Sequence, residues 1–126
     1  MKNKMINSDL APAAIGPYSH AVLAANGTLY ISGQLPIDPK TGNFAGDDIV
    51  SQTEQALQNV LVILQAAKMT KENVCKTTVY LKDMNDFTKM NEVYADFFGD
   101  IKPARAAFEV GKLPKDAKVE IEVVAC

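Results

Sequence analysis

The dipeptide Asn26-Gly27 is the feature of this 126-residue chain that most constrains its fold. It separates two runs rich in β-forming residues, from Tyr18 to Ala25 and from Thr28 to Gln34. Asn-Gly between such runs is the strongest sequence indication of a two-residue hairpin turn. The sequence therefore predicts a β-hairpin near the beginning of the chain.

Two helices are predicted further along the chain. Proline and glycine are dense from Leu35 to Asp48, which favours a loop. Asp47 and Asp48 then offer N-caps for a helix whose apolar residues recur every three or four positions and which should end near Lys68. A second helix fits Asp86 to Phe98, with Asp86 as its N-cap and the following glycine as its stop.

Three later segments alternate between apolar and polar residues as β-strands do. They are Val74 to Leu81, Ala104 to Val110 and Lys118 to Ala125. The resulting order of two strands, helix, strand, helix and two strands is neither a regular series of βαβ units nor a repeat. We therefore predict a single α+β domain over residues 1–126, in which two helices pack on one face of a mixed sheet.

Composition narrows the possible classes of function. The 13 basic and 15 acidic residues give a net charge of −2, so the chain lacks the basic excess typical of nucleic-acid binding. No apolar run is long enough for a membrane helix, and the first residues do not resemble a signal peptide, so we expect a cytoplasmic protein. Cys75 and Cys126 are expected to stay reduced, Cys75 as a small core residue and Cys126 as an exposed terminal thiol.

The last two predicted strands contain an arginine and two glutamates that can carry chemistry. Alternation places Arg105 on the same face as Ala107, and it places Glu120 and Glu122 opposite the apolar face of their strand. A guanidinium can bind a carboxylate through two parallel hydrogen bonds, and a carboxylate can orient or deprotonate a water molecule. If the strands lie close together, these groups face one cavity. The alternative is a cross-strand salt bridge on a solvated face.

Several other residues have both a structural and a ligand-binding interpretation. Asn91 on the apolar stripe of the second helix either enters a ligand site or bonds to nearby backbone. Gly33, after Ser32, marks either a bulge or a place where a ligand approaches the backbone. Tyr18 is either a half-buried aromatic or a phenol aimed at a cavity. His20 is the only histidine, so we expect it to be structural or solvated, and no metal site is predicted.

Several segments together resemble the Rid (YjgF-like) family of enamine and imine deaminases. They are Pro103 to Pro114 followed by Val119 to Glu122, Ala11 to Ser19, Ser32 to Pro36, and Asn91 to Tyr94. The resemblance covers essentially the whole chain. It implies the chorismate-mutase-like α+β fold and a homotrimer with three sites in the clefts between subunits.

The resemblance also implies roles for individual residues. Arg105 would bind the substrate carboxylate, Glu120 would position the attacking water, and the backbone of Gly33 would help hold the ligand. The other positions that match residues lining the family's cleft are Tyr18, Ser32, Asn91 and Ala107. The alanine stands where many relatives carry a cysteine, which removes a thiol but leaves the backbone carbonyl.

A protein of this family would hydrolyse reactive enamines and imines, such as 2-aminoacrylate and 2-aminocrotonate, to 2-keto acids with release of ammonia. Because the imine carbon is already electrophilic, no metal or organic cofactor is expected. Two other classes of function stay open. One is a non-catalytic sensor that binds a 2-keto acid in the Arg105 pocket, and the other is a ribonuclease or translation inhibitor, against which the acidic charge balance counts.

Overall fold

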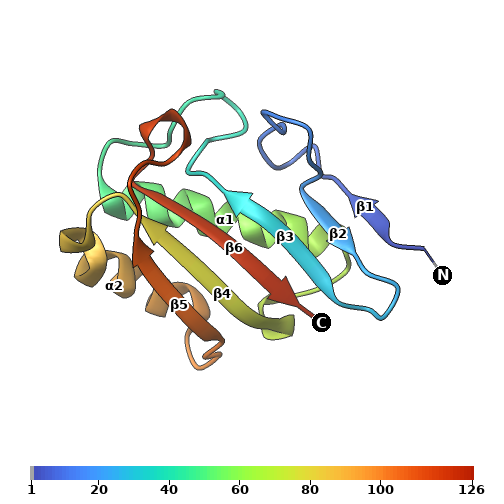
Figure 1. The fold of residues 1–126 in the computed structure, drawn as a ribbon. Coiled ribbons are helices and arrows are strands. Elements are labelled where there is room, and N and C mark those ends of the chain that lie inside the picture. Colours follow the sequence, from blue (N-terminus) through green and yellow to red (C-terminus); the bar gives the residue numbers. More distant parts are fainter. Residues whose placement is uncertain (1) are drawn as a thin grey trace.

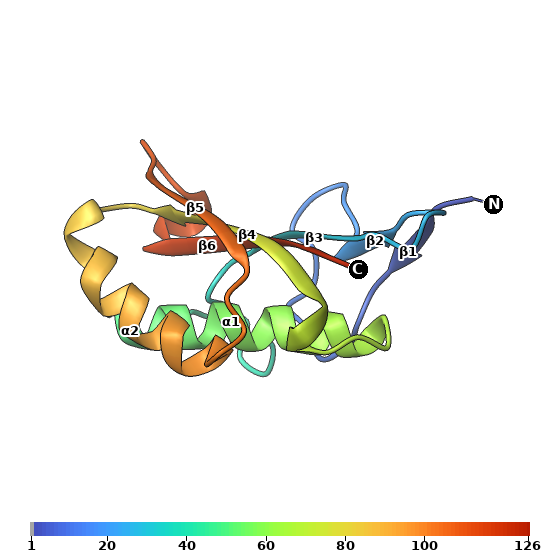
Figure 2. The same ribbon diagram turned by 90° about the horizontal axis from the view of Figure 1, so that it is seen from below.

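The computed structural model describes residues 2–126. In it the chain folds into a six-stranded mixed sheet that two helices cover on one face (Figures 1 and 2). In spatial order the strands are β1 (Lys4–Ile6), β2 (Ala21–Leu23), β3 (Leu29–Gln34), β6 (Val119–Ala125), β4 (Val74–Leu81) and β5 (Ala104–Glu109). Only β4 and β5 pair in parallel, and the other neighbours are antiparallel. The predicted α+β class and the packing of both helices on one face are confirmed.

The helices are α1 (Ile49–Ala66) and α2 (Phe87–Phe98), and both agree with the sequence prediction. The Asp48 carboxylate caps α1 by accepting a hydrogen bond from the Ser51 N–H at 3.0 Å. Helix α2 ends at Gly99, whose φ of 60° lies in the left-handed region that favours glycine. Three short 3₁₀ turns, η1 (Lys71–Asn73), η2 (Met84–Asp86) and η3 (Pro114–Asp116), connect the main elements. Neither helix is long and apolar enough to cross a membrane within residues 2–126.

The predicted hairpin is confirmed, but its turn is one residue longer than expected. Strands β2 and β3 pair antiparallel, and the Ala24 N–H donates to the Thr28 carbonyl at 2.7 Å, which leaves three residues in the loop. Gly27 has a φ of 93°, whereas Asn26 does not adopt a positive φ. A turn with a single left-handed glycine is typical of three-residue hairpin loops.

The core lies between the sheet and the two helices. The β6 side chains that face the helices are fully buried, and so are the α1 residues packed against them, including Leu57, Val60 and Leu64. From α2, Met90, Tyr94 and Phe98 complete this layer. Within residues 2–126, no helix covers the opposite face of the sheet (Figure 2). Tyr30 and Phe108 lie on that face and are each 51% exposed.

Two details differ from the sequence prediction. Strand β1 was not expected, because its three residues show no burial alternation that a pattern could reveal. Cys75 was predicted in the core and is exposed. Pairing passes from Val74 opposite Ala125 to Lys76 opposite Val124, so Cys75 is the extra residue of a β-bulge and leaves the buried face. Cys126 is exposed, as predicted.

A buried asparagine on α1 holds the loop that follows β3. Asn59 is 1% exposed, and its side-chain amide donates to the carbonyls of Leu35 and Ile37 at 3.0 and 2.9 Å. Its own oxygen accepts a hydrogen bond from Gln55 at 2.9 Å. The side chain therefore replaces the strand partners that these carbonyls lack after β3 has ended.

Replacing Asn59 by alanine should lower the free energy of unfolding by about 2–4 kcal/mol, because two buried carbonyls lose their donors. The exposed neighbour Gln58 provides the matched control, and Gln58→Ala should change stability by less than about 0.5 kcal/mol. Chemical denaturation at one fixed protein concentration measures both variants. Equal stability of the two variants would contradict the role of Asn59.

Candidate functional site

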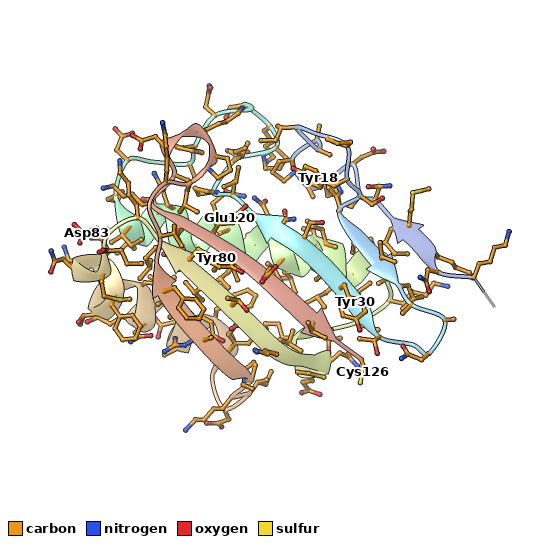
Figure 3. All side chains as sticks on the ribbon, in the orientation of Figure 1. Tyr18, Tyr30, Tyr80, Asp83, Glu120 and Cys126 are labelled. Atoms are coloured by element: carbon orange, nitrogen blue, oxygen red, sulfur yellow. The ribbon has the colours of Figure 1, made fainter. Side chains whose placement is uncertain are left out.

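The site residues predicted from the sequence form two groups that lie on opposite faces of the sheet. Tyr18, Ser32, Gly33 and Glu120 line a cavity of about 410 Å³ on the face without helices. Arg105 and Asn91 line a second cavity of about 490 Å³ between α2 and the start of β5. Figure 3 shows Glu120 and Tyr18 on the first of these faces.

A β-bulge in β3 shapes the first cavity. Pairing with β6 passes from Ile31 opposite Val123 to Gln34 opposite Ile121, so Ser32 and Gly33 stand against the single residue Glu122. The bulge predicted as one interpretation of Gly33 is therefore present. It also brings the backbone of Gly33 against the Glu120 carboxylate, since a Cβ atom on Gly33 would lie 2.6 Å from Glu120 Oε2. Any residue with a Cβ atom at position 33 would force this carboxylate to move, so glycine is required here.

Glu120 has an environment that makes its carboxylate hold a proton more strongly. Partial burial raises the pKa of Glu120, and the negative charge of Glu122 raises it further. The Tyr80 hydroxyl donates to Glu122 Oε1 at 2.6 Å on the same face, and this hydrogen bond, together with burial, raises the pKa of Tyr80 to about 12. Tyr80 is thus fixed beside the carboxylate pair as a neutral phenol (Figure 3).

Tyr80 was not selected from the sequence as a site residue. The alternation of β4 nevertheless predicts that Tyr80 lies on the face opposite Thr77, Val79 and Leu81. That face was the one signal in the sequence that could have identified Tyr80. Pairing of Tyr80 with Glu120 across β4 and β6 then places it beside the two glutamates.

The loop that carries Tyr18 is held to the sheet by His20 and Ser32. Tyr18 is 44% exposed, and its hydroxyl accepts a hydrogen bond from the Ile15 N–H at 3.3 Å. The Ser32 hydroxyl donates to the Ser19 carbonyl at 2.7 Å, and the Ser32 N–H donates to the His20 carbonyl at 2.9 Å. Ser32 therefore lines the cavity while its hydroxyl fixes the strand that follows Tyr18.

His20 is structural, which was one of the two interpretations of the sequence. It is 5% exposed, and its ring Nδ1 accepts from the Ser8 N–H at 3.1 Å. The other ring nitrogen, Nε2, lies 2.7 Å from the Pro12 carbonyl, to which it can only donate. These two contacts tie the segment before Tyr18 to the residue that precedes β2.

Arg105 is positioned by α2 rather than by a carboxylate. Its Nη1 donates to the Asn91 side-chain oxygen at 2.6 Å, and its guanidinium carbon lies 4.8 Å from the centre of the Tyr94 ring and 5.5 Å from that of Phe87. Tyr94 is itself fixed by a 2.7 Å hydrogen bond with Thr77. The cross-strand salt bridge considered for Arg105 is not formed. Asn91 bonds to the arginine and not to backbone.

Arg105 and Glu120 do not share a cavity within one chain. Strand β5 pairs with β4, with Arg105 opposite the buried Thr77, so the arginine points to the face that carries the helices. Glu120 points to the other face of β6, and β4 lies between the two strands. Ala107 lies beside Val79, packs against the core and lines neither cavity. The sequence predicted a shared cavity only if the strands of Arg105 and Glu120 lie close together. Within one chain β4 separates β5 from β6, so these two residues do not share a cavity.

The two cavities differ in the chemistry that they offer. The Arg105 cavity presents a planar cation held between aromatic rings and an amide, and such a group suits a carboxylate ligand. The Glu120 cavity presents a carboxylate of raised pKa, which suits the transfer of a proton to and from water. The first cavity therefore suits an anionic ligand, and the second suits proton transfer with water.

Comparisons with known proteins show the family to which this chain belongs. Residues 8–126 match the family model described as Endoribonuclease L-PSP. A RutC family protein from Pyrococcus horikoshii is 57% identical over 122 residues, which cover 97% of this chain and 96% of the relative. The mouse protein named 2-iminobutanoate/2-iminopropanoate deaminase is 49% identical over 122 residues, which cover 97% of this chain and 90% of that protein.

Among solved structures, a protein of the conserved Rid family from Yersinia pestis has a TM-score of 0.93 at 48% identity, covering 98% of both chains. The fold, the family model and these relatives all indicate the same group. This chain belongs to the Rid family, also called the YjgF/RutC family.

Proposed function

We propose that this protein hydrolyses reactive enamines and imines, such as 2-aminoacrylate and 2-aminocrotonate, to 2-keto acids and ammonia. The observation that carries the proposal is the Glu120 carboxylate, half-buried against Gly33 with a raised pKa. A carboxylate of raised pKa is a better proton acceptor than an ordinary one. The mouse relative named as a 2-imino acid deaminase supports the choice of substrate.

The chemistry asks little of the protein. An enamine reaches its imine tautomer, and water then adds to the C=N carbon while Glu120 takes a proton from that water. The protonated Glu120 returns this proton to the nitrogen, which gives a neutral carbinolamine. Glu120 then takes the hydroxyl proton and passes it to the nitrogen, so that the C=O bond forms, the C–N bond breaks and ammonia leaves. One water is consumed and one ammonia is released, so no cofactor is required by the balance of the reaction.

Arg105 would fix the substrate through the carboxylate that all 2-imino acids share. Its planar fork donates two parallel hydrogen bonds, and its packing against Tyr94 and Phe87 leaves the guanidinium few orientations to lose on binding. Asn91 occupies one donor and sets the direction of the fork. Tyr18, Ser32 and Gly33 would line the half of the site in which water adds.

The complete site would form between copies of the chain, as a homotrimer. Arg105 and Glu120 lie on opposite faces of one sheet, so a second copy has to supply one of them. The sheet face without helices exposes Tyr30 and Phe108, and exposed aromatic side chains of this kind are typical of subunit interfaces. Three copies around an axis would give three equivalent sites.

Ribonuclease activity is a second candidate, because the matching family model is described as an endoribonuclease. The charge of the cavity argues against it. Within the described residues, the lining of the Glu120 cavity contains two glutamates and neither lysine nor arginine. Such a surface repels the phosphates of RNA. A 2-keto acid sensor would use the same Arg105 cavity, but it would not accelerate imine hydrolysis.

Gly33→Ala should impair catalysis while leaving the fold intact. The new Cβ would lie 2.6 Å from Glu120 Oε2, so the carboxylate has to move away from its position. A displacement of about 1 Å at a reacting group costs on the order of 10²-fold in rate. Gly111→Ala is the matched control, since a Cβ there meets nothing within 4 Å. Steady-state rates and Tm are measured for both, and equal activity of the two variants would remove the role of the contact.

Glu120→Gln should abolish proton transfer and stabilise the protein above the pKa of Glu120. Because folding raises this pKa, the folded state favours the protonated acid, and the stability from that preference is lost as the pH rises through the folded pKa. Glutamine mimics the protonated form at every pH. The Tm advantage of Glu120→Gln over the parent should therefore be present at neutral pH and vanish in acid. A parental rate, or a variant less stable than the parent at neutral pH, would contradict this account of Glu120.

The shared site can be tested by mixing two inactive chains. Arg105→Ala should lose the substrate anchor and Glu120→Gln the proton carrier, so each trimer alone should be inactive. When the two chains are co-expressed in equal amounts, a site between subunits receives both intact residues in about one quarter of cases. Activity should therefore return to about one quarter of the parental level, at an unchanged oligomeric size. Absence of recovery in correctly assembled mixtures would show that the site does not join two chains.

A further inference from the structure

The two cysteines of the chain lie side by side although 51 residues separate them. Strands β4 and β6 are antiparallel, so the first residues of β4 lie beside the last residues of β6. The Sγ atoms of Cys75 and Cys126 are 3.9 Å apart, and both residues are exposed. Figure 3 shows Cys126 at this end of the sheet, away from Glu120.

The backbone around both sulfurs is held in place by Asn73. The Cys126 N–H donates to the Asn73 carbonyl at 2.9 Å, and the Asn73 side-chain amide donates to the Cys126 carbonyl at 3.2 Å. The Cys75 thiol also lies 3.6 Å from the Asn73 carbonyl. A disulfide has an S–S distance of about 2.05 Å, so bond formation requires the sulfurs to approach by less than about 2 Å. A movement of this size lies within the range that rotation about the Cα–Cβ bonds of two cysteines covers.

We propose that Cys75 and Cys126 form a dithiol site for peroxides, which closes to an intramolecular disulfide. This site is separate from the proposed deaminase site and does not depend on it. The β-bulge explains why the pair is exposed, since it moves Cys75 out of the core and places its sulfur beside Cys126. An oxidant in solution therefore reaches both sulfurs without unfolding of the chain.

The oxidation balances in two steps. The Cys126 sulfur attacks one peroxide oxygen, an S–O bond forms as the O–O bond breaks, and the departing hydroxide takes the thiol proton to become water. The Cys75 sulfur then attacks this sulfenic acid, so that an S–S bond forms, the S–O bond breaks, and a second water leaves. Two thiols together lose two electrons, and one peroxide is reduced to two waters.

Cys126 is the sulfur that attacks first. The Cys75 thiol donates a hydrogen bond to the Cys126 sulfur, and this bond raises the pKa of Cys75. The Cys75 proton faces two acceptors, the Asn73 carbonyl and the Cys126 sulfur, whereas the Cys126 sulfur accepts, so the first attack on peroxide falls to Cys126. The disulfide then joins the beginning of β4 to the residue that follows β6. It constrains the unfolded chain over a loop of 51 residues.

Hydrogen peroxide added in slight excess to the reduced protein tests the site. The number of free thiols per chain, measured by thiol titration, should fall from two to none. The intact mass should fall by the mass of two hydrogen atoms. Non-reducing gels should show single chains, and Tm should rise by roughly 5 °C or more and return on reduction. Persistent thiols, chains joined to one another, gain of oxygen without a disulfide, or an unchanged Tm would overturn the proposal.

The single variants Cys75→Ser and Cys126→Ser are the matched controls. Neither should gain Tm on oxidation, because neither can close the bond. In Cys75→Ser, a sulfenic acid should accumulate on Cys126 and be trapped by dimedone, whereas Cys126→Ser should react several-fold more slowly. Equal trapping in both variants would overturn the assignment of Cys126 as the attacking sulfur. All these readings are covalent or thermal, so they stand or fall independently of deaminase activity.

Discussion

The pairing of β6 with β3 on one side and β4 on the other is the constraint on which the rest of the structure depends. Val119, Ile121, Val123 and Ala125 are at most 2% exposed against the helices. This buried face fixes the register of β6, because a slip by one residue would bring the glutamates into the core. Glu120 and Glu122 are thereby held on the opposite face, against the β3 bulge. The carboxylate pair thus depends on the buried face of β6 for its position.

The same strand order also separates the two halves of the candidate site. Strand β5 lies at the edge of the sheet and pairs in parallel with β4, so β4 separates it from β6. Arg105 is consequently oriented by α2, through Asn91 and the ring of Tyr94, while Glu120 is oriented by β3. Because one chain does not bring Arg105 and Glu120 to one cavity, the proposed activity requires assembly as well as folding.

Much of this arrangement could be predicted from local pattern, and the parts that could not have specific causes. The apolar spacing and caps identified α1 and α2, and alternation put Glu120 on the correct face of β6. Alternation failed at Cys75, because a bulge adds one residue that a period of two does not contain. The bulge at Gly33 was predicted only as one of two interpretations. The carboxylate that Gly33 contacts, Glu120, is distant in sequence, so no local pattern shows the contact. The insertion of β4 between β5 and β6 is a long-range pairing, which no local pattern encodes. The family resemblance, by contrast, already implied a site between subunits.

The central claim is that this chain accelerates the hydrolysis of 2-imino acids, and the rate of that reaction tests it most directly. The imine is generated in place by a dehydratase acting on an amino acid, and formation of the keto acid is followed over time at several concentrations of the purified protein. We predict a rate that rises in proportion to the protein concentration, well above the spontaneous rate in buffer. A rate equal to the spontaneous one at every concentration, measured with folded and assembled protein, would contradict the proposed function.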